Sequence, residues 1–357
     1  MRIIYVGNAA LNYAGSRYYY HHRRFVNGLV RGGHDVWFFS DRDQFRAKFP
    51  LVRKRRAVNR DLVALAKNYE PEAVFLCSAE IITNDTLREI RAMLPALRIA
   101  QINVDAVYND YNRRRFLARR EVLDAQFFNT AGAAALSPFA SDRAPCYFLP
   151  NLTDSGQDTG RAFDLDKPPY DLICTQSTDP RVPSDMEREK LALDIERALP
   201  GLVTCYRGFA GRPGLHGRAY IKATGESAMG LNLTKTASGG GESTLATRYL
   251  GTSSRLAHIM GNGALALIPD QFGLESMYRD GEDAVFFANA GDAIEKIGFY
   301  RSNPQARRSI ARKGWEKAHG EFEGHIVMQY ALARLMGHKL ARDYIWPTEA
   351  VFDGARA

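Results

Sequence analysis

Several features that mark common protein classes are absent from this chain of 357 residues. It has no apolar run of about 20 residues, the length that a helix needs to span a bilayer. Its apolar beginning, residues 1–7, is too short for the core of a secretory signal. The cysteines form no C-x-x-C pair, so the sequence contains no zinc or thiol redox motif. We therefore expect a cytoplasmic protein with four buried free thiols: Cys77, Cys146, Cys174 and Cys205.

Motifs for nucleotide and hydrolase chemistry are also missing. The first apolar run is followed by GNAALN rather than the G-x-G-x-x-G of a dinucleotide enzyme. Neither the P-loop motif nor the G-x-S-x-G elbow of hydrolases occurs. Two D-x-D strings, at residues 41–43 and 164–166, could each hold a divalent ion that bridges a diphosphate. Ordinary turn acids are the simpler interpretation, and we expect neither a metal nor a cofactor.

Positive charge is what the sequence has in excess, with a formal net charge of +8. The excess lies in two runs, Arg46–Arg60 and Arg113–Arg120. Basic runs suit anionic partners, although a solvated face is the plain alternative. No zinc finger, RNA-binding signature or helix-turn-helix pattern accompanies the charge. We therefore expect no nucleic-acid partner, and favour an anionic acceptor or peripheral contact with the inner face of a membrane.

Apolar runs and helical patterns alternate along the chain, which predicts parallel sheets covered on both faces. The first domain is expected over residues 1–150, beginning with a strand at 2–6 and a helix at 17–31. Residues 151–169 are rich in Pro, Gly, Ser and Asp and are interpreted as a linker. A second alternating series predicts another domain over residues 170–340, and the tail, 341–357, is expected to pack back toward the first domain.

The predicted fold class is therefore α/β, with two Rossmann-like domains facing across a cleft. Ligands of such sheets bind at the carboxyl ends of the strands, where the strand order reverses. A cleft between two domains is a common ligand site.

Residues 253–320 carry motifs that are similar to a known family. They comprise Arg255, His258, Gly263, GLESMYRDGEDAVFFAN from residue 273 and SNPQARRSIARKG from residue 302. In order and spacing these resemble the C-terminal domain of GT-B glycosyltransferases, most closely the CgeB-like set of glycosyltransferase group 1. One departure is His258, because the family has a glutamate on this helix that contacts the donor in many retaining enzymes. The departure leaves the identity of the donor nucleotide open.

The resemblance implies an enzyme that moves a sugar from a nucleotide sugar to a glycan or lipid-linked polysaccharide acceptor in cell-envelope polysaccharide biosynthesis. It favours a retaining, metal-independent reaction in which the nucleotide sugar is a co-substrate. Two alternatives stay open: a nucleotide-sugar epimerase built from two Rossmann domains, and a non-catalytic nucleotide-sugar-binding protein.

Side chains for the donor are expected near the start of the helix at 253–260. Arg255 and His258 are three residues apart and share a helix face, and a helix N-terminus attracts phosphate. Glu275 follows the strand at 264–268 and could accept hydroxyl hydrogen bonds. The structural alternatives are an ion pair for Arg255, a buried histidine for His258 and a helix cap for Glu275. The predicted donor-binding residues are Arg207, Arg248, Thr252, Ser253, Ser254, Arg255, His258 and Glu275.

The first domain is expected to hold the acceptor. Asn8 follows the first strand, and Tyr18 and His21 begin the first helix, where an aromatic ring could stack on a sugar. Asp105 and Glu80 each follow a predicted strand. An inverting transferase needs a base for the acceptor hydroxyl, for which Asp105 is the first candidate and Glu80 the second. In a retaining enzyme these carboxylates would only orient the substrate.

Overall fold

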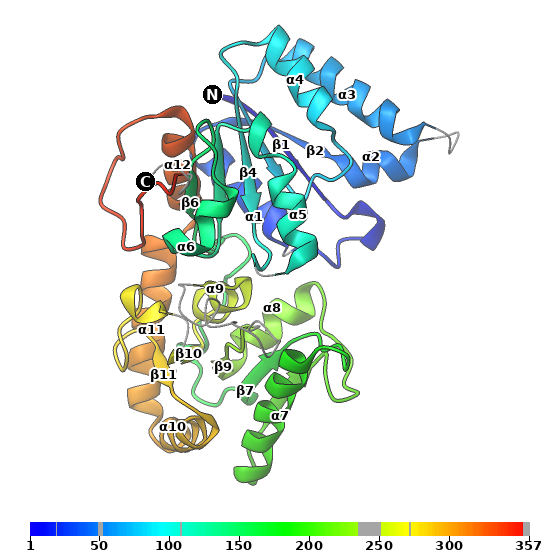
Figure 1. Cartoon of the computed structure of the whole chain (residues 1–357). Helices are drawn as coiled ribbons and strands as arrows, with labels where there is room; N and C mark the ends of the chain where they lie inside the picture. The colour runs from blue at the N-terminus through cyan, green and yellow to red at the C-terminus, as the bar shows by residue number, and fades with distance from the viewer. Residues whose placement is uncertain (19, 49–52, 108, 235–250, 271–272, 353–357) are drawn as a thin grey trace. The chain divides into compact units, whose positions relative to one another are not determined.

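The structure is a computed structural model of the chain, and it describes all residues except 19, 49–52, 108, 235–250, 271–272 and 353–357. The chain forms two compact units, one from residues 1–150 and 324–357 and the other from residues 151–323. Each unit contains one parallel sheet with helices on both faces, which confirms the predicted α/β class of two Rossmann-like domains (Figure 1). None of the described helices is both long and apolar enough to cross a bilayer.

The sheet of the first unit has six strands in the order β2-β1-β3-β4-β5-β6. Ile4 lies opposite Trp37 on one side and Val74 on the other. The central strands are apolar along their length because helices cover both faces. The strands are β1 (Arg2–Gly7), β2 (Asp35–Ser40), β3 (Ala73–Cys77), β4 (Arg98–Asn103), β5 (Ala125–Phe128) and β6 (Cys146–Phe148).

Two groups of helices cover this sheet. Helices α3 and α4 pack on the face that carries Ile4 and Val6, whereas Phe25 of α1 contacts Tyr5 on the other face. Helix α12 packs against α1, and Gly28 approaches the backbone of Gly324 so closely that a side chain at this position would collide with it. The helices are α1 (His21–Arg31), α2 (Asp41–Ala47), α3 (Lys54–Tyr69), α4 (Asn84–Met93), α5 (Asp110–Leu117), α6 (Ala133–Leu136) and α12 (Gly324–Met336).

The sheet of the second unit has five strands in the order β11-β10-β9-β7-β8. Helices α7, α10 and α11 contribute to one buried cluster with the strands, and α8 and α9 pack on the other face. The strands are β7 (Tyr170–Thr175), β8 (Thr204–Arg207), β9 (Ser227–Leu231), β10 (Leu265–Pro269) and β11 (Val285–Phe287). The helices are α7 (Pro183–Ala198), α8 (Arg218–Gly225), α9 (Ser254–Gly261), α10 (Ala290–Ser302) and α11 (Pro304–Glu321).

Several local features differ from the sequence prediction. Helix α1 begins at His21 rather than residue 17, because Ala10 and Ala14 adopt left-handed backbone and the chain turns repeatedly before the helix. Residues 324–340 lie in the first unit instead of the second. All four cysteines are buried free thiols, as predicted.

The segment 151–169, interpreted from its composition as a linker, is packed into the second unit. Thr153 donates a backbone hydrogen bond to Phe322 at 2.8 Å. The carboxylate of Asp158 lies 2.7 Å from Nδ1 of His258 and accepts a hydrogen bond from Asn262 at 3.1 Å. Some of its polar residues, Asp158 among them, therefore form buried hydrogen bonds, and a polar composition alone does not distinguish this use from solvent exposure.

The strand order of each sheet reverses once. In the first unit the chain passes from β1 outward to β2 and then returns to β3 on the other side of β1. In the second unit it passes from β7 to β8 and returns to β9 on the other side of β7. The crevice beyond the carboxyl ends of such a strand pair is the usual ligand site of an open α/β sheet. The carboxyl ends of β1 and β3, and those of β7 and β9, are therefore the expected ligand sites of the two sheets.

Candidate functional site

Arg255 spans the reversal point of the second sheet. Its Nε donates to the carbonyl of Thr175 at 2.6 Å and its Nη1 to the carbonyl of Leu233 at 2.9 Å. Thr175 ends β7, and Leu233 lies just beyond β9. Two strands that are distant in sequence therefore fix the guanidinium at the carboxyl edge. Helix α9 brings Arg255 there because Ser253 caps it, accepting a hydrogen bond from the backbone N–H of Leu256 at 3.4 Å.

The charge of Arg255 is not balanced within the described part of the chain, where no carboxylate forms an ion pair with it. Burial lowers the pKa of its guanidinium from the ordinary value, yet an arginine keeps its proton in a protein. A half-buried cation without a counter-ion is unfavourable unless an anion binds to it. The arrangement therefore suits a phosphate or diphosphate.

Arg188 reinforces this edge and was missed by the sequence analysis. It is buried on α7, donates to the same Leu233 carbonyl at 3.1 Å and pairs with Asp185 at 2.6 Å. Gln176 and Asn232 were also missed, although each directly follows a strand of the reversal point. A search for polar residues immediately after the strands would have found these two amides.

The other predicted donor residues take varied places. Arg207 ends β8 and donates to the carbonyl of Tyr206 at 3.0 Å. Thr252 is buried, and its hydroxyl accepts from the side-chain amide of Asn151 at 2.9 Å. Ser254 is exposed at the first turn of α9, and Glu275 is exposed in the short 3-10 helix Leu274–Ser276. Arg248 lies outside the described residues.

His258 does not join Arg255 at the strand ends. Its side chain is 3% exposed, and its Nδ1 meets Asp158 of the segment 151–169. The edge of its ring also contacts Tyr220, with ring centroids 5.2 Å apart. These contacts agree with the structural alternative, a buried histidine with its hydrogen bond satisfied.

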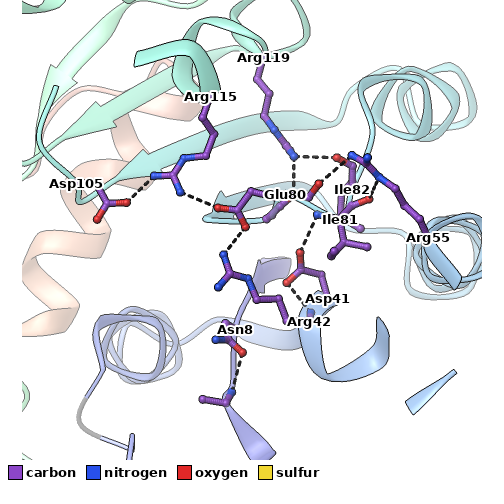
Figure 2. A network of polar contacts seen from close by, with 12 residues as sticks. Asn8, Asp41, Arg42, Arg55, Glu80, Ile81, Ile82, Asp105, Arg115 and Arg119 are labelled. Carbon is purple, nitrogen blue, oxygen red and sulfur yellow. Dashed lines mark hydrogen bonds and ion pairs between the residues drawn. The ribbon is translucent and has the colours of Figure 1, made fainter. Parts of the chain in front are cut away.

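In the first unit, the loop after β3 is held by four arginines from three stretches of chain: α2, α3, and α5 with the turn that follows it. Figure 2 shows Arg42, Arg55, Arg115 and Arg119 converging on residues 80–82. Arg55 donates to the carbonyls of residues 80 and 81 at 2.9 and 3.0 Å, and Arg119 donates to those of residues 79 and 82 at 2.5 and 2.8 Å. Such clamping fixes the backbone that carries Glu80.

The carboxylate of Glu80 is the centre of this network (Figure 2). One oxygen accepts from Arg42 at 2.5 Å and the other from Arg115 at 2.7 Å. Arg115 also reaches Asp105, at 2.5 Å, so it joins the two predicted catalytic carboxylates. The structure thus brings Glu80 and Asp105 together at the carboxyl ends of β3 and β4.

The ion pairs decide the protonation of this site. Partial burial alone would raise the pKa of Glu80, but the hydrogen bonds and charges of Arg42 and Arg115 hold it below its ordinary value. Burial raises the pKa of neighbouring Asp41 to about 6, and the charge of Glu80 adds to this. Glu80 is therefore a charged, weakly basic carboxylate, suited to accept hydrogen bonds more than to remove a proton.

Asn8, Tyr18 and His21 lie in or directly after the loop that follows β1. The carboxamide of Asn8 accepts from the N–H of Ala10 at 3.1 Å, which shapes the loop. Tyr18 is half-buried in a turn. His21 begins α1, and burial lowers its pKa to about 4, an effect that the charge of Asp105 partly offsets. Its ring is therefore neutral at physiological pH.

The basic runs divide between this network and solvent. Arg115 and Arg119 are drawn into the network, so they do not form the solvated face considered for Arg113–Arg120. Arg113 and Arg114, on α5 with Arg115, are exposed. Arg56 and Arg60 of the other run are exposed on α3. Residues 49–52 of that run lie outside the described residues.

Solved structures with the same fold extend over nearly the whole chain. HepE from Anabaena, in complex with UDP and glucose, is 13% identical with a TM-score of 0.58, covering 94% of this chain and 100% of its own. Sucrose-phosphate synthase from Thermosynechococcus elongatus is 11% identical with a TM-score of 0.51, covering 92% and 96%. TarM from S. aureus, in complex with fondaparinux, α-GlcNAc-glycerol and UDP, is 9% identical with a TM-score of 0.52, covering 78% and 59%. At these identities the likeness shows the fold.

The sequence itself matches a family as well. Residues 190–333 match the model of the glycosyl transferase-like family. This match and the shared fold bear out the resemblance to GT-B glycosyltransferases of group 1 that the sequence predicted. No curated protein matches its sequence. The match contains residues 253–320, which carry the motifs of that resemblance, while the narrower placement in the CgeB-like set stays a prediction.

Proposed function

We propose that this chain is a glycosyltransferase that binds a UDP-sugar at the carboxyl edge of the second sheet. The observation that carries the proposal is Arg255, a cation held across β7 and β9 without a carboxylate partner among the described residues. HepE and TarM, which share the fold, were both solved with UDP bound. The guanidinium and the N-terminal amides of α9 would bind the diphosphate and stabilise the negative charge that develops as the sugar departs. Ser254, which begins α9, and Arg207, which ends β8, are further candidates on that edge.

The acceptor is proposed to bind at the carboxyl edge of the first sheet. Asp105, whose side chain is 45% exposed, can accept a hydrogen bond from an acceptor hydroxyl. Arg115 orients it together with Glu80 through an ion pair to each. The exposed Arg113 and Arg114 would draw in an anionic glycan or a lipid-linked acceptor at a membrane surface.

A retaining and metal-independent reaction agrees best with these contacts. Arg42 and Arg115 hold the pKa of Glu80 below its ordinary value, which makes Glu80 a poor proton acceptor, and a retaining transferase needs no base for the acceptor hydroxyl. Both D-x-D strings are also engaged: Asp41 accepts two backbone hydrogen bonds, and Asp43 pairs with Arg46. Asp164 pairs with Arg161 and Arg312, and Asp166 with Arg308. These contacts support the proposal that neither string binds a divalent ion.

Calorimetric titration with UDP tests the donor site. Arg255→Ala should weaken binding by about 1.5–3 kcal/mol, the range for hydrogen bonds to charged groups. Arg197→Ala is the matched control, because Arg197 lies near the far end of α7 and pairs only with Asp194 among the described residues. Equal binding by the wild type and Arg255→Ala would refute the assignment of the donor site.

Product analysis tests the reaction. Incubation with a UDP-sugar and EDTA, with and without a glycan acceptor, should give a new glycoside only when the acceptor is present. Proton coupling constants of its anomeric centre report retention or inversion. Conversion of the UDP-sugar without an acceptor would favour the epimerase, and binding without turnover would favour a non-catalytic protein.

A further inference from the structure

Two buried side-chain amides at the reversal point of the second sheet have polar atoms without hydrogen-bond partners in the described part of the chain. Gln176 directly follows β7 and is 6% exposed, and both its Nε2 and its Oε1 are unpartnered. Asn232 directly follows β9 and is fully buried. Its Oδ1 accepts from the hydroxyl of Ser253 at 2.7 Å, which leaves its Nδ2 unpartnered.

Unpartnered buried amides destabilise a protein, because they lose their hydrogen bonds to water and gain none in return. Proteins retain such groups mainly at functional sites, where a ligand completes the bonding. Gln157 is also buried and its side-chain amide is unpartnered among the described residues, but it lies in the segment 151–169 and does not directly follow a strand. The distinction of Gln176 and Asn232 is that both lie where ligands of this fold bind.

The backbone around Gln176 is held rigidly. Its N–H donates to the carbonyl of Arg207 at 3.2 Å. Its own carbonyl lies against Gly208, which has a φ of 85° and no room for a β-carbon. The amide is therefore presented from a fixed position, as a binding group should be.

The two amides flank Arg255. Gln176 follows Thr175, whose carbonyl accepts from Nε of Arg255, and Asn232 precedes Leu233, whose carbonyl accepts from Nη1. A diphosphate bound by Arg255 would thus have an amide on each side. Phosphate oxygens only accept hydrogen bonds and cannot satisfy Oε1 of Gln176, whereas a hydroxyl both donates and accepts.

We propose that Gln176 and Asn232 hydrogen-bond the hydroxyl groups of the nucleotide sugar, either those of the transferred sugar or those of the ribose. The inference rests on the proposed donor site at Arg255. It adds the residues that recognise the hydroxyl-bearing part of the donor beside the diphosphate. Discrimination between sugars at such a site follows from the penalty of leaving these amides unpaired.

The test uses Gln176→Met, which keeps the length of the side chain and removes its polar atoms, with Gln157→Met as the matched control. Without ligand, both variants should melt at or above the temperature of the wild type, because an unsatisfied buried amide is removed. With ligand, Gln176→Met should bind UDP-glucose at least about 10-fold more weakly, a loss of one hydrogen-bonded contact, and Gln157→Met should bind as the wild type does. Gln176→Glu provides a second variant of similar shape that retains acceptors only.

Titration with UDP and UDP-glucose in parallel identifies the hydroxyls. Weaker binding of both ligands by Gln176→Met assigns the ribose, and weaker binding of UDP-glucose alone assigns the transferred sugar. Unchanged binding of both ligands overturns the inference, as does a lower melting temperature of ligand-free Gln176→Met, which would show that the amide is satisfied within the protein. Failure of the wild type to bind UDP would instead refute the donor site itself.

Discussion

Replacing Glu80 by glutamine removes the charge at the centre of the first unit's arginine network. Its pair with Arg42, whose side chain is 37% exposed, is close to a surface pair and contributes about 0.5–1 kcal/mol. Its pair with Arg115, whose side chain is 17% exposed, resembles a hydrogen bond to a charged group and contributes about 1.5 kcal/mol. Glu80→Gln should therefore lower the free energy of unfolding by about 2 kcal/mol at neutral pH.

The pH dependence of this effect follows from the lowered pKa of Glu80 in the folded protein. A carboxyl with a depressed folded pKa stabilises above its unfolded pKa, about 4.3, and this contribution is lost as the pH falls through the folded pKa. The difference between wild type and Glu80→Gln should thus be full at pH 7 and shrink in acid.

Urea unfolding at several pH values, followed by circular dichroism, measures this difference. Asp85→Asn is the control in the same unit, because Asp85 pairs with Arg88 at a fully exposed position and should change stability by less than about 0.5 kcal/mol. A loss below about 0.5 kcal/mol for Glu80→Gln, or one that does not vary between pH 7 and pH 3, would refute the argument that the ion pairs of Glu80 stabilise the unit.

Two further predictions concern a buried ion pair and the exposed basic surface. His319 and Glu323 form an ion pair in the second unit. Burial opposes the charge of each, but their contact raises the pKa of His319. The same contact and the hydrogen bonds from Ser155 lower the pKa of Glu323. The contribution of Glu323 to stability is lost in acid, and the contribution of His319 is lost as the pH rises. The stability difference between wild type and Glu323→Gln should therefore be greatest between about pH 4.5 and 6.5. Thermal unfolding measures this difference, and a difference that does not change with pH would contradict the argument. The double variant Arg113→Ser, Arg114→Ser should bind anionic phospholipid vesicles about 30-fold more weakly at low salt, because each arginine contributes about 1 kcal/mol. Cosedimentation with the vesicles measures this binding. Equal cosedimentation of variant and wild type would refute the proposed contact with a membrane surface.

Local patterns predicted the parts of this protein that depend on neighbouring residues. The apolar runs at residues 2–6 and 73–77 indicated buried parallel strands, and Ser253 indicated the start of a helix; the structure has β1, β3 and α9 there. Parallel strands place the residues that follow them at one edge of the sheet, so Glu80 and Asp105 could be assigned to a common edge. Their shared partner Arg115 could not be predicted from the sequence. It is 35 residues from Glu80 and 10 from Asp105 in the chain, and whether it pairs with them depends on where α5 packs.

Burial and pairing were decided by the tertiary structure. The sequence determined that His258 lies one helical turn from Arg255, but not that Asp158, 100 residues earlier, would meet its ring. It also determined a polar stretch at residues 151–169, whose hydrogen-bond partners are supplied by α9 and by the end of the second unit. Secondary structure follows from short-range backbone preferences and apolar periodicity, whereas the partner of a charged or polar side chain depends on which distant segments the folded chain brings within about 3 Å.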